Sequence, residues 1–271
     1  MDDVERLRIE QLNRATQAWG DRVGARLQLC LTPLYKEGPR HPELFGSGIL
    51  LRAKDLTFLL TAAHVAEQVT TGPHYFGAND ELLPLGGLRM TSPLAEGATR
   101  EKDRLDLAYW VLSPHIASRI PSQQVLRSQD LDFDSSTEAV DGLQYFVNGY
   151  PASRQPRRLT EEPFEARPFA YITEEMSASE YRELALGRVQ NLFVAFDKAD
   201  TYRLGDKVQG PDLFGVSGGA LWRLSGGAAT MQSPKLAGII ISWRTAEPKG
   251  IIATRTHVIV AHLASQFPNV R

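Results

Sequence analysis

A single serine stands between glycines in the stretch Leu213-Phe214-Gly215-Val216-Ser217-Gly218-Gly219. A serine hydroxyl is a weak nucleophile until a neighbouring base takes its proton, so a catalytic Ser217 needs a histidine and a carboxylate elsewhere in the chain. The glycines suit a backbone that aims N–H groups at a developing oxyanion, because glycine lacks a Cβ and accepts positive φ. A plain Gly/Ser turn between two strands is the alternative interpretation.

A candidate base follows a short apolar run that ends in Thr61-Ala62-Ala63-His64. A strand that stops there leaves the imidazole at the edge of the strand layer, next to alanines that give it room. Histidine is the side chain that most often serves as a general base near neutral pH. Taken alone, His64 could equally be a satisfied core or surface histidine.

A candidate acid opens the apolar run Leu107-Ala108-Tyr109-Trp110-Val111-Leu112. A carboxylate at the boundary of a buried strand is costly unless it is hydrogen-bonded, so we expect a partner for Asp106. Asp103 is the competing carboxylate. Because Asp103 lies among charged residues, we expect it to stay in water.

The segments that must position these residues are mostly strands, joined by Gly- and Pro-rich loops. Strands are predicted over 24–35, 45–52, 56–60, 74–76, 83–90, 144–151, 169–173, 192–196, 235–244 and 250–254. Helices are predicted over 2–20, 177–187 with Ser177 or Ser179 as N-cap, and 256–266. Polar and acidic residues over 113–142 suit a crossing between two halves. We therefore expect an N-terminal helix over 1–23 that packs on the body, a first lobe over 24–125 and a second lobe over 126–271.

The order of the candidates is histidine, aspartate, serine, which is the order of the chymotrypsin arrangement. The sequence resembles the trypsin-like, chymotrypsin-fold serine peptidases over roughly residues 24 to 267. Four motifs in the family's order carry the resemblance: Thr61-Ala62-Ala63-His64, Asp106-Leu107-Ala108, Gly215-Val216-Ser217-Gly218-Gly219 and Ser242-Trp243. It implies an all-β fold of two six-stranded antiparallel β-barrels with the active site in the cleft between them.

The resemblance also implies a role for each matched residue. His64 would take the proton of Ser217 and later protonate the leaving amine, while Asp106 would fix the imidazole tautomer. The backbone N–H groups of Gly215 and Ser217 would form the oxyanion hole. Ser242 matches the serine that hydrogen-bonds the buried aspartate in the family.

One residue inside the serine motif departs from many secreted relatives. Those relatives carry an acid just before the nucleophile, which pairs with an amino terminus freed by cleavage. Val216 stands at that position and can make no ion pair. We therefore predict that the site does not depend on a freed N-terminus.

Substrate preference is less constrained by the sequence. The resemblance places Pro211, with Asp212 beside it, at the floor of the primary pocket, and Trp243 along the substrate cleft. Asp212 would attract a basic P1 side chain or point elsewhere. Arg244 replaces a glycine of the family, and it would narrow the pocket, pair with Asp212 or favour acidic substrates. We rank basic P1 ahead of small apolar or acidic P1.

Composition narrows the partners and the compartment. The 30 Lys+Arg and 32 Asp+Glu residues give a formal net charge of −2, so no basic footprint for nucleic acid is present. Cys30 is the one cysteine, which excludes an intrachain disulfide and metal sites built from several thiolates. Met1 to Arg6 are charged where a secretory signal would be apolar, and no apolar run approaches ~20 residues. We expect a cytoplasmic protein without cofactor or metal that binds neither nucleic acid nor membrane.

The resemblance predicts a serine endopeptidase of a bacterial, cytosolic type that acts on protein or peptide substrates. A protease with access to every cytoplasmic protein must be narrow or controlled, so we expect limited proteolysis of a dedicated partner and a possible regulatory partner. A catalytically latent or non-catalytic peptide-binding module on the same fold is the first alternative. An α/β-hydrolase is the second alternative, and that fold needs an acid and then a histidine after the serine. Here the acid would be Glu247 and the histidine His257 or His262, which lie too close together near the end of the chain for the strand and helix pairs of that fold.

Overall fold

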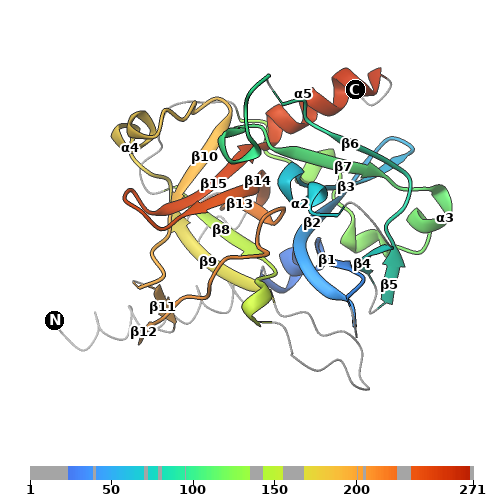
Figure 1. Ribbon diagram of the computed structural model, residues 1–271, viewed down its shortest axis with the longest axis horizontal. Helices are drawn as coiled ribbons and strands as arrows, with labels where there is room; N and C mark the ends of the chain where they lie inside the picture. Colours follow the sequence, from blue (N-terminus) through green and yellow to red (C-terminus); the bar gives the residue numbers. More distant parts are fainter. Residues whose placement is uncertain are drawn as a thin grey trace.

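Two curled antiparallel sheets lie side by side in the computed structural model of the chain (Figure 1). The structure describes residues 24–38, 41–69, 73–78, 81–94, 96–134, 143–154, 168–199, 201–203, 206–224 and 233–268. The helix expected over residues 1–23 lies outside these ranges. Among the residues that the structure describes, no helix combines the length and the apolar character needed to cross a membrane.

The first sheet, on the right in Figure 1, has seven strands within the described ranges, in the order β5-β4-β1-β2-β3-β7-β6. The strands are β1 Leu31–Lys36, β2 Glu43–Ala53, β3 Leu56–Ala62, β4 His74–Ala78, β5 Glu81–Pro84, β6 Leu88–Thr91 and β7 Leu107–Val111. It therefore has one strand more than the six that were expected. The predicted hairpin is confirmed as β2 and β3, which turn at Lys54 with a φ of 51°.

The second sheet has six strands in the described part of the chain, in the order β10-β15-β14-β13-β8-β9. They are β8 Gln144–Gly149, β9 Phe169–Glu174, β10 Asn191–Ala195, β13 Ala220–Leu224, β14 Lys235–Arg244 and β15 Gly250–Arg255. A separate ribbon pairs β11 Thr201–Arg203 with β12 Asp206–Val208. Every strand pair in both sheets is antiparallel, which excludes the mostly parallel sheet of an α/β-hydrolase.

Short helices occur between and after the strands. They are α2 Ala63–Glu67, α3 Pro114–Ala117, α4 Ala178–Glu183 and α5 Thr256–Gln266, with 3-10 turns η1 Arg100–Lys102, η2 Ser122–Gln124, η3 Ser128–Asp130 and η4 Ala152–Arg154. The predicted C-terminal helix is confirmed as α5. The cap of α4 is confirmed as Ser177, which forms a capping box with Glu180.

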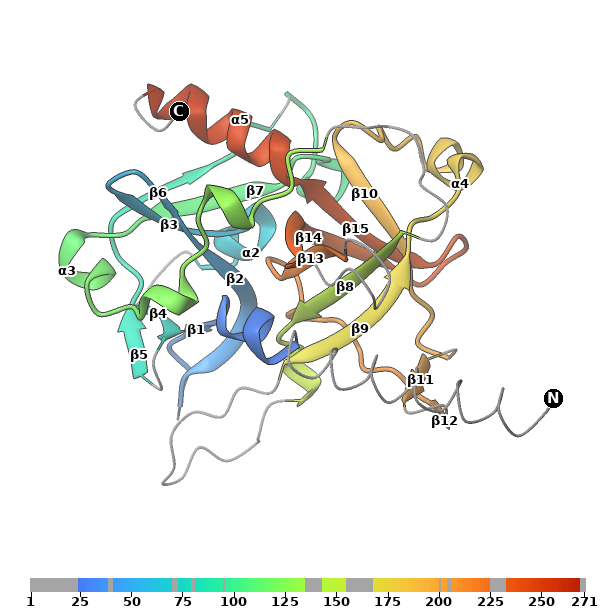
Figure 2. The ribbon, with the colours of Figure 1, turned by 180° about the vertical axis from the view of Figure 1, so that it is seen from behind.

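An apolar core joins the two sheets. Phe58 and Tyr109 of the first sheet belong to one buried cluster with Phe146 and Trp222 of the second. Seen from behind in Figure 2, α5 runs along the top of the molecule, and its Ile259 and Leu263 are buried in the same cluster. The segment after β7 is tied to both sheets, because Leu126 bridges to Leu51 and Leu131 bridges to Leu236. These contacts hold the two lobes together.

Residues 24–29 are helical, so the strand predicted from residue 24 is wrong and β1 begins only at Leu31. Leu27 and Cys30 are buried while Leu29 is exposed. Residues three apart share one face of a helix, whereas alternation would have buried Leu29 together with Leu27. A stretch this short fits both periods, and packing decides between them.

Candidate active site

His64 sits at the point where β3 gives way to α2. Ala62 and Ala63 are fully buried, and the small side chains let the chain turn here. The His64 side chain is 32% exposed, so the imidazole reaches from the packed sheet toward solvent. The prediction that His64 stands at the edge of the strand layer is confirmed.

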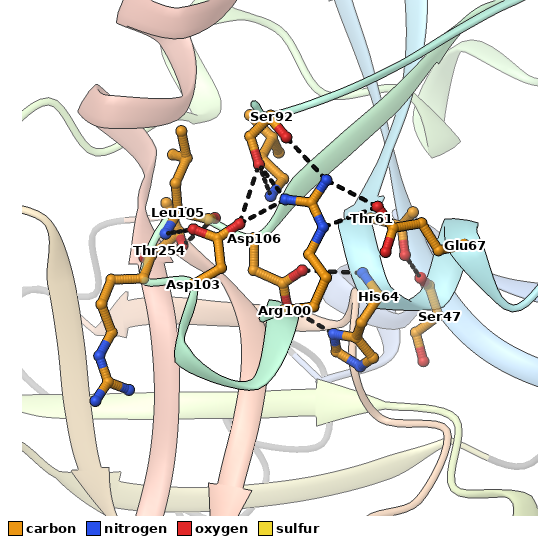
Figure 3. A network of polar contacts seen from close by, with 12 residues as sticks. Ser47, Thr61, His64, Glu67, Ser92, Arg100, Asp103, Leu105, Asp106 and Thr254 are labelled. Atoms are coloured by element: carbon orange, nitrogen blue, oxygen red, sulfur yellow. Dashed lines mark hydrogen bonds and ion pairs between the residues drawn. The ribbon is translucent and has the colours of Figure 1, made fainter. Parts of the chain in front are cut away.

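Asp106 lies next to His64, at the start of β7, and makes two hydrogen bonds with it (Figure 3). The Asp106 Oδ2 atom is 2.6 Å from His64 Nδ1, and Oδ1 accepts from the His64 backbone N–H at 2.9 Å. The Asp106 carbonyl also accepts from the N–H of Ala63 at 2.9 Å. The aspartate thus fixes both the ring and the backbone of the histidine.

The chemistry of this pair follows from burial and from the direction of its hydrogen bonds. Burial raises the pKa of the Asp106 carboxyl, and the two bonds from His64 act in the opposite direction. When Asp106 is ionised, it accepts the proton of Nδ1, which leaves Nε2 as the lone-pair nitrogen. That nitrogen is the one that can accept a proton.

Ser217 lies in the turn that leads into β13. Val216 donates its N–H to Leu213 O at 2.9 Å and Gly219 donates to Val216 O at 2.8 Å, which closes the turn. Gly218 has a φ of 83°, and a Cβ there would collide with Ser47 O and Thr61 Oγ1 of the first lobe. Glycine is required at this position both by conformation and by the close approach of the two lobes.

Ser47 connects the serine turn to the histidine strand, a role the sequence did not suggest. Its N–H donates to Ser217 O at 3.0 Å, and its hydroxyl donates to Gly215 O at 2.8 Å. Thr61, three residues before His64, donates its hydroxyl to Ser47 O at 2.7 Å. Hydrogen bonds therefore link the backbone of Ser217 to the strand that ends just before His64, and Figure 3 shows the bond from Thr61 to Ser47.

Two backbone N–H groups of the turn are unused. Within the described ranges, neither Gly215 nor Ser217 donates its N–H to another group, although the N–H groups of Val216, Gly218 and Gly219 all do. Gly215 has a φ of 91°, in the region that favours glycine. The two free donors are those expected for an oxyanion hole.

The described residues include no hydrogen bond between Ser217 Oγ and His64. Such bonds are often long before substrate binds, so the missing contact does not remove Ser217 as a candidate. The structure brings Asp106 and His64 into direct contact. The backbone of Ser217 is connected to β3, the strand that ends just before His64, through the hydrogen bonds of Ser47 and Thr61.

Ser242 does not supply the expected partner of Asp106. In the part of the chain that the structure describes, the Asp106 carboxylate is hydrogen-bonded by His64 and not by Ser242. Ser242 instead pairs with Ile252 in the β14–β15 ladder, at a register shift. The second lobe reaches the aspartate differently, because Asn191 and Thr254 donate to the carbonyls of Arg104 and Leu105.

Asp103 is also not where the sequence placed it. Its side chain is only 10% exposed and forms an ion pair with Arg100 at 2.7 Å. It also accepts the N–H of Leu105 at 2.9 Å, and Arg100 contacts Ser92 and Glu67 as well (Figure 3). Asp103 therefore shapes the loop before Asp106, and its expected exposure to water is wrong.

The predicted specificity residues differ in their exposure and in their contacts. Asp212 is 59% exposed, and its carboxylate forms an ion pair with Lys198 at 2.6 Å. Arg244 donates to Pro248 O at 3.3 Å and has no ion pair among the described residues, which excludes its pairing with Asp212 there. Half-buried Trp243 packs edge-on against Phe196. Pro211 is half-buried and makes no side-chain polar contact.

Phe214 is a further candidate for contact with substrate, which the motifs of the sequence did not indicate. It directly precedes Gly215 and is 64% exposed, although large aromatic side chains are usually buried. Leu213, the residue before it, is buried, so the apolar character of the stretch does not reveal which of the two side chains is exposed. Its position beside a free N–H donor suits contact with substrate.

The two curled antiparallel sheets, with few helices, define a chymotrypsin-like double-barrel fold. Neither protein-family models nor curated proteins match this sequence. Solved structures match by fold. One is neuropsin, a serine protease expressed in the limbic system of mouse brain, with a TM-score of 0.56 and 15% identity over 89% of this chain and 95% of its own. Another is granzyme C, GrC, with a TM-score of 0.53 and 15% identity over 90% and 96%. At this identity the likeness establishes the fold alone.

Proposed function

We propose that the protein is a serine endopeptidase that works through an acyl-enzyme. Two observations carry the proposal: the Asp106–His64 pair, joined at 2.6 Å, and a serine turn whose Gly215 and Ser217 N–H groups are unused among the described residues. A base with a fixed tautomer and a pair of free donors are what acyl transfer from an amide requires. The protease fold of the solved structures supports this reaction class.

The proposed reaction needs no group beyond the chain, the substrate and water. His64 Nε2 takes the proton of Ser217 Oγ as the oxygen attacks the substrate carbonyl carbon, and Asp106 stabilises the resulting imidazolium. The oxyanion accepts from Gly215 and Ser217, each worth on the order of 3 kcal/mol. The C–N bond then breaks and the amine leaves with the proton held by His64. Water attacks the acyl-enzyme with His64 as base, which releases the acid and restores Ser217.

The proposed substrate class follows from which charged side chains near the predicted pocket already have an ion-pair partner. We place an apolar or acidic P1 residue ahead of a basic one, because Asp212 is already paired while Arg244 carries no counter-ion in the described ranges. Val216 is buried in the apolar cluster of the second lobe, so nothing there calls for a freed amino terminus. The biological role we propose is limited proteolysis of a dedicated protein partner in the cytoplasm.

A fluorophosphonate probe with intact-mass readout tests the proposal. The wild-type protein should gain one phosphonyl group, mapped by peptide mass to Ser217, and His64→Ala should label far more slowly. Ser217→Ala should not label at all. Labelling of a different residue, or equal labelling of wild type and His64→Ala, would contradict the proposed function.

The second candidate is a latent or non-catalytic peptide-binding module on the same fold. The observation in its favour is that Ser217 Oγ makes no hydrogen bond to His64 among the described residues. A wild-type protein that stays unlabelled at every pH and probe concentration, yet unfolds cooperatively, would favour this candidate.

A further inference from the structure

Two buried polar side chains of the second lobe donate hydrogen bonds to backbone carbonyls of the first lobe. Asn191 of β10 and Thr254 of β15 are direct cross-strand partners, and both are fully buried. Asn191 Nδ2 donates to Arg104 O at 2.7 Å, and Thr254 Oγ1 donates to Leu105 O at 2.7 Å. A buried amide and hydroxyl thus grip two consecutive carbonyls across the lobe boundary.

These two carbonyls lie directly before Asp106, whose backbone is strained. Asp106 has a φ of 36°, a region that costs a residue with a side chain on the order of 1–3 kcal/mol and persists only where surrounding contacts impose it. The first lobe holds the other side of the loop, since Asp103 accepts from Leu105 N and Ser92 Oγ accepts from Leu107 N. The strained aspartate is therefore fixed from both lobes, with its neighbours bonded on each side.

The Asn191 side chain bears a cost that stability alone does not explain. Its Oδ1 atom is buried and has no hydrogen-bond partner within the described residues. An unpaired buried acceptor destabilises a fold, so an apolar residue of similar size would suit a purely structural position better. What an asparagine provides here, and an apolar residue would not, is the hydrogen bond from Nδ2 to Arg104 O.

Rigid surroundings keep the two donors in place. Arg255, the residue after Thr254, is buried and donates its Nε to Asn191 O at 3.1 Å. Arg255 also forms an ion pair with Glu175 at 3.3 Å, and Glu175 accepts from Tyr181 at 2.8 Å. The strands that carry Asn191 and Thr254 are thus cross-linked below the lobe boundary.

We propose that Asn191 and Thr254 form an interlobe clamp that positions Asp106 for catalysis. The inference rests on the proposed function, because it assigns these residues to the acid of that site. Both residues bond to backbone carbonyls and neither has a hydrogen bond to the Asp106 carboxylate among the described residues, so both are positioning residues. The clamp does from the second lobe what Ser242 was expected to do, but through the backbone before the aspartate. The orientation of Asp106 then depends on how the two lobes are seated.

Labelling kinetics of two matched variants test the clamp. Thr254→Val removes the hydroxyl at nearly constant shape, and Thr254→Ser keeps it. In the full chain, Thr254→Val should lower the fluorophosphonate labelling rate by about tenfold or more, because a small displacement of a catalytic group is costly. Thr254→Ser should label close to the wild-type rate. A purely structural hydroxyl would lower the thermal unfolding midpoint of Thr254→Val and leave the labelling rate of the folded protein unchanged, which would overturn the proposal.

A second readout works even if the protein has no catalytic activity. In the Ser217→Ala chain, the Nδ1 proton of His64 should give a downfield NMR signal from its bond to Asp106, assigned by its loss in His64→Ala. The clamp predicts that Thr254→Val shifts this signal upfield or broadens it by faster exchange, and that Thr254→Ser preserves it. Asp103 is the other charged group that acts on Asp106, and none of these variants changes it. An identical signal in Thr254→Val would overturn the clamp, whereas an unlabelled wild type with the expected NMR changes would overturn only the proposed function.

Discussion

The two halves of the candidate site are built in opposite ways. Around Asp106 and His64, the polar atoms are used by neighbours in both lobes, from Ser92 and Asp103 on one side to Thr254 on the other. Around Ser217, two N–H donors and the hydroxyl are unused among the described residues, and Phe214 is exposed. The base and its acid, His64 and Asp106, are thus held in place before substrate binds, whereas the groups around Ser217 are still free to bind it.

This contrast has a physical reason. A base and its acid must hold one tautomer and one orientation through the reaction, which favours hydrogen bonds completed in the folded state. Donors for an oxyanion must be free before the oxyanion forms, because a donor that is already bonded would have to break that bond first. The predictions below alter one half and leave the other intact.

The largest expected effect comes from Asp106→Asn. An asparagine offers an N–H₂ group to His64 where the carboxylate accepted a proton, so the ring would take the wrong tautomer. We expect the labelling rate of Ser217 to fall by about 10⁴-fold, as in comparable triads.

Glu81→Gln is the matched control for this loss. It changes an exposed carboxylate of β5 whose ion pair with Arg119 lies away from the site. The control should label at the wild-type rate. Comparable losses in Asp106→Asn and Glu81→Gln would break the comparison between the two halves.

Gly218→Ala should damage the serine half through stability. Its positive φ and the collision with Ser47 and Thr61 together predict a loss of about 2 kcal/mol or more in the free energy of unfolding. Urea unfolding measures this, and Gly86→Ala is the control because nothing lies within 4 Å of a Cβ there. Equal losses in the two variants would show that the close approach of the lobes at Gly218 is not a constraint.

Three partly buried histidines lie outside the site. Burial lowers the pKa of His74, His257 and His262 below the ordinary histidine value of 6.5. The folded chain then binds protons less readily than the unfolded chain. The stability from these residues is complete above about pH 6.5 and is lost as the pH falls toward their folded-state pKa values.

Urea midpoints between pH 8 and pH 5.5 check the sign. His262→Phe keeps an aromatic ring against Tyr109 and removes one titrating group, so it should lose less stability on acidification than the wild type. Burial raises the pKa of Asp132, which acts in the opposite direction but is common to both chains. An unchanged pH dependence in His262→Phe would show that His262 is not held neutral.

The smallest effect is expected from Asp212→Asn. An exposed ion pair contributes at most about 1 kcal/mol, so stability should hardly change. Because the carboxylate is already paired with Lys198, the ratio of kcat/KM for peptides with Arg and with Leu at P1 should also stay the same. A selective loss for the Arg peptide would restore the basic preference that the sequence suggested.

The elements that carry chemistry were largely predictable because each has a local signature. His64 follows two alanines at a strand end, Asp106 opens an apolar run, and Ser217 stands among glycines, so the sequence pattern records both the element and its end. The hairpin of β2 and β3 and the helix α5 were predicted for the same reason. Their residues bury one face at a regular period.

Contacts between distant segments were not predictable. Asp103 is surrounded by charged neighbours in the sequence, yet Arg100 and the turn before Asp106 draw it out of water. Ser242 matched a motif, but the register shift in its ladder accompanies a different pairing, and Thr254 bonds the aspartate loop. The local sequence around a residue does not show which segment of the other lobe will bond to its backbone carbonyl.

The crystal structure of the fluorophosphonate adduct tests the central claim most directly. We expect a phosphorus atom bonded to Ser217 Oγ, with its oxygen accepting from the N–H groups of Gly215 and Ser217. The Asp106 Oδ2 to His64 Nδ1 distance should remain near 2.6 Å, as in the free protein. A phosphonyl oxygen turned away from both N–H groups, or an Asp106–His64 pair that forms a different contact in the adduct, would contradict a base assembled in advance beside an open oxyanion hole.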